Sequence, residues 1–282
     1  MLNPNKISYE NSSVFLTGAT GFVGKFLLDY AGFLYEQGTN LKITALSRDP
    51  QKFLTNNKKY QNLPWLSWVR GNVEALDKLS GSFTHVMHCA ADTHSLENRL
   101  EWYDQLIRGT RSALDFAIKV TAKKFFFMSS GAAYGTLQNA GERFKEDDSS
   151  APLTSDVRLV YGHGKRQAEM LCALYNDAYN IDCTIGRCFA VIGEYMPLDG
   201  NYAAGNFIRD ALSSSTSEIK VKGDGRAIRT YIDGRDLAEW TFYIMQNGSP
   251  GEIYNLGGTT PISISELAGV IRDIVAPDKK VT

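Results

Sequence analysis

The segment from residue 13 to residue 37 constrains the fold more than any other part of the chain. A short apolar run at residues 13–16 leads into glycines, and an amphipathic helical pattern follows at residues 21–37. Glycines at this spacing permit a tight turn, a close approach of the backbone to a pyrophosphate, and close packing of a helix on a sheet. The start of the helix would also offer free N–H groups to phosphates. We therefore predict a dinucleotide-binding turn at the first strand–helix junction, formed by Gly18, Thr20, Gly21, Phe22, Val23 and Gly24.

Short apolar runs alternate with longer helical segments along the first two thirds of the chain. This alternation is typical of βαβ units, so we expect an α/β protein with a doubly wound parallel sheet. We predict strands at residues 13–16, 42–46, 66–70, 85–88, 124–128 and 182–187, and helices at 21–37, 102–122 and from about 160 to beyond 174. After residue 187 the pattern becomes irregular and rich in Gly, Asn and Tyr, which predicts a small C-terminal subdomain that binds the substrate. We place the first domain at residues 1–187 and 226–247, and the subdomain at 188–225 and 248–282.

Charge and cysteine content exclude several classes of partner. The 282 residues include 30 Lys and Arg and 31 Asp and Glu, so the net charge of −1 favours neither nucleic acid nor an anionic membrane. No CxxC pair or histidine at zinc-ligand spacing accompanies the four cysteines, which predicts reduced thiols, no metal site and a cytoplasmic location. No stretch has the composition of a secretion signal or of a membrane span.

Tyr161 and Lys165 are four residues apart, which places both side chains on one face of the helix expected near residue 160. A nearby ammonium favours the phenolate, so it lowers the pKa of a tyrosine and permits proton exchange near neutral pH. The segment FMSSGAAYG at residues 127–135 lies between this pair and the glycine turn TGATGFVG. Together these segments resemble the extended short-chain dehydrogenase/reductases, the family of NAD(P)-dependent nucleotide-sugar epimerases, dehydratases and reductases. The resemblance covers roughly residues 12–270 and implies a Rossmann-type fold.

The resemblance implies roles for three catalytic residues. Ser130 would bond the substrate oxygen, Tyr161 would exchange a proton with it, and Lys165 would hold the nicotinamide ribose and tune Tyr161. Ser129 is expected to be a structural or cofactor neighbour. Relatives that dehydrate a 4-keto sugar carry an Asp-Glu pair directly after the position of Ser130, because elimination needs an added acid and base. Gly131 and Ala132 stand there in this chain, which disfavours a 4,6-dehydratase.

The expected end of the second strand favours NADP over NAD. NAD-selective relatives carry an acidic residue there that bonds the ribose 2′-hydroxyl. This chain has Ser47 at that position, followed by Arg48, whose guanidinium could pair with a 2′-phosphate. NAD remains the alternative cofactor. The resemblance also assigns cofactor-binding positions to Asn72, Val73, Ala90, Ala91, Tyr161 and Lys165.

Some positions depart from the family pattern. Residues 106–110 read LIRGT where the family has NVxGT, so an asparagine is missing, and residues 187–190 read RCFA in place of RxFN. These departures leave the Ser130, Tyr161 and Lys165 set intact. His88, His94 and His163 are expected to be packed or solvated neighbours.

The substrate side is expected in the C-terminal part. Residues 223–233 resemble the GDGxxxRxYxxV stretch of the family, in which the arginine that matches Arg229 binds the substrate diphosphate. Asn206 is expected to add a second polar contact to the diphosphate. Asp233 and Asp236 should brace the following helix. Relatives continue beyond the point where this chain ends, so we expect an incomplete substrate lobe, and the family suggests a homodimer.

These features lead to one main hypothesis and two alternatives. The main hypothesis is an enzyme of deoxysugar biosynthesis that uses NADPH to reduce a nucleotide-linked keto-sugar, a 4-keto-6-deoxyhexose, with Tyr161 as proton donor. The first alternative is an NAD(P)-dependent nucleotide-sugar epimerase, which would share every motif. The second is a non-catalytic dinucleotide sensor on the same fold.

Overall fold

The chain forms two compact units in the computed structural model. The structure describes residues 9–91, 98–136, 143–200 and 202–282. The first unit comprises Met1–Cys188 and Arg235–Leu256, and the second comprises Phe189–Gly234 and Gly257–Thr282.

A seven-stranded sheet is the centre of the first unit. Its strand order is β10-β6-β5-β4-β1-β2-β3, and every neighbouring pair is parallel. The strands are β1 (Ser12–Thr17), β2 (Leu41–Ser47), β3 (Leu66–Arg70), β4 (His85–His88), β5 (Lys124–Ser130), β6 (Asp182–Cys188) and β10 (Ile253–Leu256). The six strands expected from the sequence are therefore confirmed, with ends that differ by at most two residues. Because the chain leaves β1 toward β2 on one side and returns to β4 on the other, a topological switch point lies beside the glycine turn.

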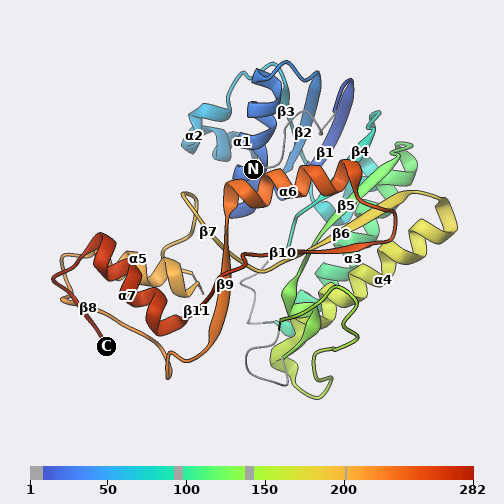
Figure 1. The fold of residues 1–282 in the computed structure, drawn as a ribbon. Coiled ribbons are helices and arrows are strands. Elements are labelled where there is room, and N and C mark those ends of the chain that lie inside the picture. The colour runs from blue at the N-terminus through green and yellow to red at the C-terminus, as the bar shows by residue number, and fades with distance from the viewer. Residues whose placement is uncertain (1–8, 92–97, 137–142, 201) are drawn as a thin grey trace. The chain divides into compact units, whose positions relative to one another are not determined.

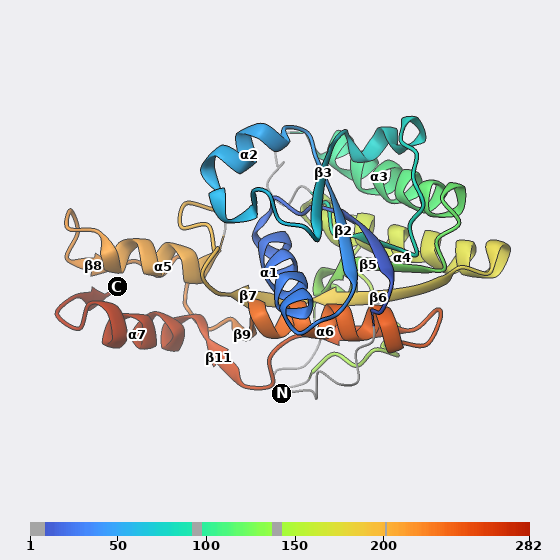
Figure 2. The same cartoon turned by 90° about the horizontal axis from the view of Figure 1, so that it is seen from above.

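Helices cover both faces of this sheet, as Figures 1 and 2 show. The helices α1 and α6 lie on one face, and α3 and α4 lie on the other, where they pack against each other. The helices of the unit are α1 (Phe22–Glu36), α2 (Pro50–Asn56), α3 (Arg99–Lys119), α4 (Val160–Tyr179) and α6 (Gly234–Asn247), with 3-10 turns η2 (Lys58–Tyr60), η3 (Val73–Lys78), η4 (Gly131–Tyr134) and η5 (Val157–Leu159). The arrangement is a Rossmann-type fold, as expected.

Burial on both faces explains the composition of the central strands. Residues 125–127 of β5 are three consecutive phenylalanines, each at most 1% exposed, because a parallel sheet between two helical layers has no polar face. Phe15 of β1 lies 4.6 Å, between ring centroids, from Phe116 of α3. The helix expected at 102–122 begins three residues earlier, because the Asn98 side chain accepts a hydrogen bond from the backbone N–H of Glu101 and caps the helix there.

The second unit contains two small sheets and two helices. Its elements are β7 (Ala190–Ile192), α5 (Ala203–Leu212), β8 (Glu218–Ile219), β9 (Ile228–Asp233), β11 (Pro261–Ser263), α7 (Ile264–Val275) and β12 (Lys280–Val281). One sheet has the order β11-β9-β7 and the other pairs β8 with β12. The helices α5 and α7 pack against each other.

The observed units differ from the expected domain boundaries in two segments. Residues 226–234 fall in the second unit because β9 pairs with β7 and β11. Residues 248–256 fall in the first unit because β10 extends the large sheet beside β6. Among the described residues, no helix is long and apolar enough to cross a membrane.

Candidate active site

The glycine turn between β1 and α1 has the geometry that a dinucleotide needs. Gly18 has a φ of +79°, and a Cβ there would lie 2.7 Å from the backbone of Cys89 and Ala90 at the end of β4. Gly21 caps α1 without any side-chain hydrogen bond, and the first turn of α1 carries no acidic residue. The first N–H groups of α1 therefore keep their capacity to bind an anion, and the residues at this turn fit a pyrophosphate.

Gly24 brings α1 against the turn itself. A Cβ at position 24 would lie 2.1 Å from the carbonyl oxygen of Gly18 and 2.6 Å from the carbonyl carbon of Ala19. Both neighbours are backbone atoms of the glycine turn, so neither can move aside without changing the shape of that turn.

We predict that Gly24→Ala weakens both folding and dinucleotide binding. Displacement of α1 should lower the free energy of unfolding by about 1–3 kcal/mol, the usual cost of overpacking. The matched control is Gly269→Ala in α7, where an added Cβ meets no atom within 4 Å and alanine should stabilise the helix by about 1 kcal/mol. Urea unfolding and fluorescence titration with dinucleotide measure both effects, and equal behaviour of the two variants would contradict the role of Gly24.

The end of β2 is followed by one cation, Arg48, and by Asp49, whose carboxylate caps α2. Ser47 is buried, and its hydroxyl accepts a hydrogen bond from the backbone N–H of Asp49. Asp49 itself caps α2 by accepting from Lys52 N–H. Arg48 is exposed and makes no hydrogen bond or ion pair with the described residues. Sequence reasoning missed Arg70, an exposed residue at the end of β3 that is paired in register with Ser47.

The predicted cofactor neighbours at the ends of β3 and β4 occupy turns. The Asn72 side chain accepts from Glu74 N–H and caps η3, and Val73 lies 3.4 Å from a Cβ built on Gly109 of α3. The backbone N–H of Ala90 donates to the Thr17 hydroxyl. Ala90 and Ala91 are partly exposed, so the end of β4 presents small residues beside the glycine turn.

His88 is a structural residue, as the sequence predicted. Its ring nitrogens hydrogen-bond to the hydroxyls of Thr17 (2.8 Å) and Thr110 (3.3 Å), which ties β1, β4 and α3 together. Complete burial lowers the pKa of His88 to about 3, so the imidazole is neutral at physiological pH. His163 is partly buried on α4, and His94 lies outside the described residues.

The first turns of α4 bring Tyr161 and Lys165 to the carboxyl end of β5. The Lys165 Nζ atom donates to the carbonyl oxygen of Met128 at 2.7 Å and lies 5.7 Å from the centroid of the Tyr161 ring. Lys165 is 2% exposed, and burial lowers its pKa to about 8. It therefore remains an ammonium at neutral pH, and one bond to Met128 leaves two of its three N–H donors for a ribose diol.

Two glycines inside the YGHGK segment allow this convergence. A Cβ on Gly162 would lie 2.4 Å from the carbonyl oxygen of Ala132, so the glycine lets the η4 turn approach α4. The same turn begins at Ser130, whose hydroxyl accepts from Ala132 N–H at 3.2 Å. A Cβ on Gly164 would lie 2.6 Å from the Leu106 side chain, so this glycine lets α3 approach α4. The predicted Ser130, Tyr161 and Lys165 thus lie on elements that pack directly against one another.

A buried ion pair between Glu169 and Arg187 contacts the end of β5 through Ser129. Glu169, one helical turn after Lys165, accepts two hydrogen bonds from Arg187 at 2.9 and 2.7 Å and one from the Ser129 hydroxyl at 2.5 Å. Arg187 also lies over the ring of Tyr134, with its guanidinium carbon 4.1 Å from the centroid. Ser129 is therefore structural, and Glu169 is a residue that sequence reasoning missed although its i+4 spacing from Lys165 was a usable signal.

Burial also governs the thiols near Lys165. Cys89 directly follows β4 and Cys188 ends β6, the strands on either side of β5, and burial raises the pKa of each thiol to about 12. All four cysteines of the chain are free. Both groups are therefore neutral thiols beside the ammonium.

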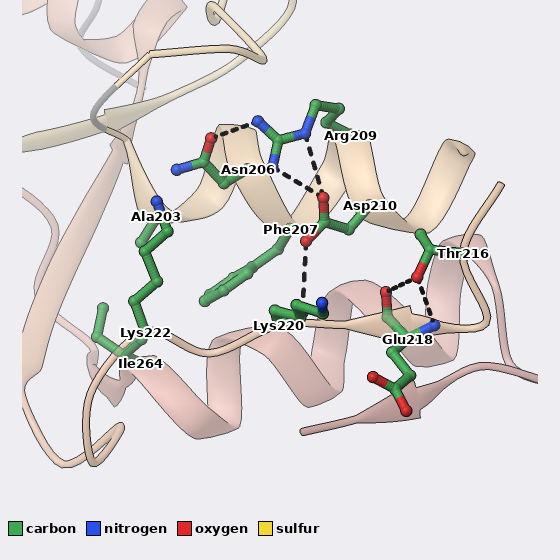
Figure 3. Close-up of a pocket in the computed structure, with 10 residues that line it drawn as sticks. All are labelled: Ala203, Asn206, Phe207, Arg209, Asp210, Thr216, Glu218, Lys220, Lys222 and Ile264. Carbon is green, nitrogen blue, oxygen red and sulfur yellow. Dashed lines mark hydrogen bonds and ion pairs between the residues drawn. The ribbon is translucent and has the colours of Figure 1, made fainter. Parts of the chain in front are cut away.

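The second unit contains a cavity of about 430 Å³ between α5 and the β8 segment. Lys220 and Lys222 lie on either side of the Phe207 ring, and Arg209 and Asp210 lie together along α5 (Figure 3). Arg209 bonds Asp210 and the Asn206 side-chain oxygen, whereas the ammonium groups of Lys220 and Lys222 make no ion pair with the described residues. The full lining is Ala203, Asn206, Phe207, Arg209, Asp210, Thr216, Glu218, Lys220, Lys222 and Ile264.

Of the predicted substrate-binding residues Asn206 and Arg229, only Asn206 lines the cavity. Asn206 lines the cavity, on the second turn of α5. Arg229 lies on β9, exposed, and its guanidinium donates to the carbonyl oxygen of its neighbour Ile228. It is not among the residues that line the cavity.

The sequence is similar to a known protein family and to individual characterised enzymes. Residues 14–257 match the model of the NAD dependent epimerase/dehydratase family. UDP-glucuronic acid decarboxylase 4 of Arabidopsis thaliana is 28% identical over 273 residues, which are 95% of this chain and 58% of that protein. The UDP-N-acetyl-alpha-D-glucosaminuronate decarboxylase of Bacillus cytotoxicus is 29% identical over 94% of this chain and 81% of its own length. The chain thus spans under two thirds of the length of the Arabidopsis relative.

Solved structures share the fold at lower identity. The dTDP-glucose 4,6-dehydratase of Bacillus anthracis in complex with NAD has a TM-score of 0.80 at 22% identity, over 96% of this chain and 84% of that one. The UDP-glucose 4-epimerase of Thermotoga maritima with UDP-glucose has a TM-score of 0.77 at 21% identity, over 96% and 85%. At this level of identity the likeness shows the fold.

Proposed function

Because the chain belongs to the NAD dependent epimerase/dehydratase family, we propose that it is an enzyme that reduces a nucleotide-linked keto-sugar, a 4-keto-6-deoxyhexose, with NADPH. The observation that carries the proposal is the packing of the Ser130 turn and the Tyr161–Lys165 face at the end of β5, with no carboxylate on the turn. This set can hold a carbonyl oxygen and deliver a proton to it.

Each residue of the set has a distinct role. Lys165 binds the nicotinamide ribose with its spare donors, and its ammonium stabilises negative charge on the Tyr161 oxygen. Ser130 donates a hydrogen bond to the substrate carbonyl, and Tyr161 supplies the proton that the oxygen acquires on reduction. Bound NADPH supplies the hydride. The glycine turn and the start of α1 hold the pyrophosphate.

The turn after Ser130 argues against elimination chemistry. Dehydration of a keto-sugar needs an added acid and base near the reacting carbons, and η4 reads Gly131, Ala132, Ala133, Tyr134. Dehydratases and decarboxylases occur among the relatives, so their reactions are the outcomes that the assay must separate from reduction.

The cavity in the second unit has cationic side chains that suit phosphate groups. Lys220 and Lys222 contribute two ammonium groups without acidic partners in the described part of the chain, and Asn206 adds an amide. Ammonium groups of this kind bind phosphates as point charges.

A substrate panel tests the proposed function. The protein is incubated with NADPH and UDP-, dTDP-, GDP- or CDP-linked 4-keto-6-deoxyhexoses, and coenzyme oxidation is followed by absorbance. Stoichiometric oxidation with formation of a deoxysugar supports the reductase. Isomer exchange without net change of coenzyme would instead establish the epimerase, and loss of water or of carbon dioxide from a nucleotide-linked hexose or uronic acid would establish the chemistry of the relatives.

We predict that Arg48 contributes to a preference for NADPH over NADH. Arg48→Ala should weaken NADPH binding by about tenfold, the value of one charge-assisted hydrogen bond, and leave NADH binding unchanged. Arg70→Ala should act in the same direction, because Arg70 pairs in register with Ser47. Lys42→Ala, which removes an exposed cation at the other end of β2, is the matched control. Equal losses for both coenzymes in fluorescence titrations would exclude a 2′-phosphate contact.

A further inference from the structure

The ring of Tyr161 lies against an indole from a different helix. The centroids of the Trp102 and Tyr161 rings are 5.4 Å apart and their planes differ by 19°, which is a stacked arrangement. Trp102 is 5% exposed. It belongs to the first turns of α3, 59 positions before Tyr161 in the chain.

The packing of α3 on α4 makes this contact. Trp102, Leu106 and Thr110 are spaced by four residues and lie on one face of α3. Leu106 fills the space that the missing side chain of Gly164 leaves on α4, and the Thr110 hydroxyl bonds His88 at the end of β4. The position of Trp102 is therefore set by two further contacts along the same helix face.

We propose that Trp102 is a positioning residue for Tyr161, which fixes the orientation of the phenol ring and keeps water from one of its faces. The inference rests on the proposed function, because it concerns the orientation of the proton donor. A tyrosine ring rotates about two side-chain bonds. Its hydroxyl is the atom furthest from the backbone, so a small rotation displaces it most. A flat indole against the ring restricts the pivot, while Lys165 approaches the same ring from within α4. A proton donor misplaced by about 1 Å can cost a hundredfold in rate.

Two substitutions at position 102 separate positioning from general packing. Trp102→Leu keeps an apolar side chain but removes the aromatic surface, so kcat for keto-sugar reduction should fall by about tenfold to a hundredfold. The KM for substrate and coenzyme should stay unchanged, because neither binding surface is altered. Trp102→Phe keeps a flat ring and should restore most of the lost kcat.

Trp65 offers a matched control for the loss of a buried indole. Trp65 is 7% exposed, packs against Gly32 of α1 and directly precedes the amino end of β3. Trp65→Leu should lower the melting temperature as Trp102→Leu does but leave kcat unchanged. Wild-type kcat in Trp102→Leu, an equal loss of kcat in Trp65→Leu, or failure of Trp102→Phe to rescue would each overturn the proposal.

A spectroscopic measurement tests the contact without any substrate. In protein with isotope-labelled tyrosine, the ring signals of Tyr161, assigned with Tyr161→Phe, should be shifted by the ring current of Trp102. The shift should vanish in Trp102→Leu and persist in reduced size in Trp102→Phe. An unshifted wild-type signal would overturn the proposal. If the protein reduces no keto-sugar, the proposed function fails, and the ring-current shift alone then decides whether Trp102 orients Tyr161.

Discussion

Tyr161→Phe is expected to lower turnover by at least about a hundredfold while leaving NADPH binding largely intact. The substitution removes one oxygen atom from a ring that stacks on Trp102, so the packing of α3 against α4 should survive. It also removes the proton donor that the proposed reaction requires. General acid catalysis contributes about 10²–10⁴-fold to rate, and kcat should fall by an amount in this range. Steady-state kinetics and fluorescence titration of NADPH measure the two effects.

Lys165→Met provides the contrasting variant. Lys165 would bind the ribose, so its removal should weaken NADPH binding as well as turnover, in contrast to Tyr161→Phe. Burial of the Lys165 ammonium is unfavourable, as its lowered pKa indicates. An apolar methionine at this position should therefore leave the protein folded. Turnover that persists in Tyr161→Phe would refute the proton-donor role, and normal NADPH binding in Lys165→Met would refute the ribose contact.

The fold could be predicted because its determinants are local in the sequence. Each central strand is a short apolar run, since a parallel sheet covered on both faces needs no alternation. Each predicted helix carries its own periodic apolar face. The glycine turn was recognisable because the backbone conformation at Gly18 and the close approach at Gly24 both require glycine. Helix ends were less predictable, as the cap at Asn98 illustrates.

The boundaries between the units depend on pairings between distant segments. Residues 226–234 belong to the second unit because β9 pairs there with β7 and β11. The sequence of this segment does not reveal that pairing. β10 joins β6, which lies 65 or more positions earlier in the chain. Such partners follow from tertiary packing, and the local pattern of residues 248–256 contains no signal for them.

The same distinction applies to the site. Tyr161, Lys165 and Ser130 were predicted because their spacing and order form motifs. Trp102 and Arg70 could not be found in this way, because each reaches the site through the packing of one element on another. Arg229 illustrates the reverse case, since the motif supplies the expected arginine while its guanidinium bonds the carbonyl of Ile228.

Glu169→Gln is expected to be the most destabilising of the substitutions considered. Arg187 is 4% exposed in its side chain and Glu169 is 7% exposed, so neither charge is solvated. The neutral amide would leave the Arg187 charge buried without a counterion, and breaking such a pair costs about 3–5 kcal/mol. The loss should appear as a lower urea midpoint. Because Glu169 also accepts from Ser129, next to Ser130, kcat should fall even under conditions where the variant is folded.

Two comparisons separate the buried charge from other effects of the substitution. Asp29→Asn breaks the exposed pair with Lys59, whose side chains are 36% and 49% exposed, and should cost no more than about 1 kcal/mol. The double variant Glu169→Gln with Arg187→Leu removes both charges and should regain much of the lost stability, because an apolar replacement of a buried ion pair is often neutral. Equal stability of Glu169→Gln and Asp29→Asn would show that the Arg187 charge is compensated by other groups. A double variant no more stable than Glu169→Gln would assign the loss to the cation contact between Arg187 and Tyr134, which the second substitution also removes.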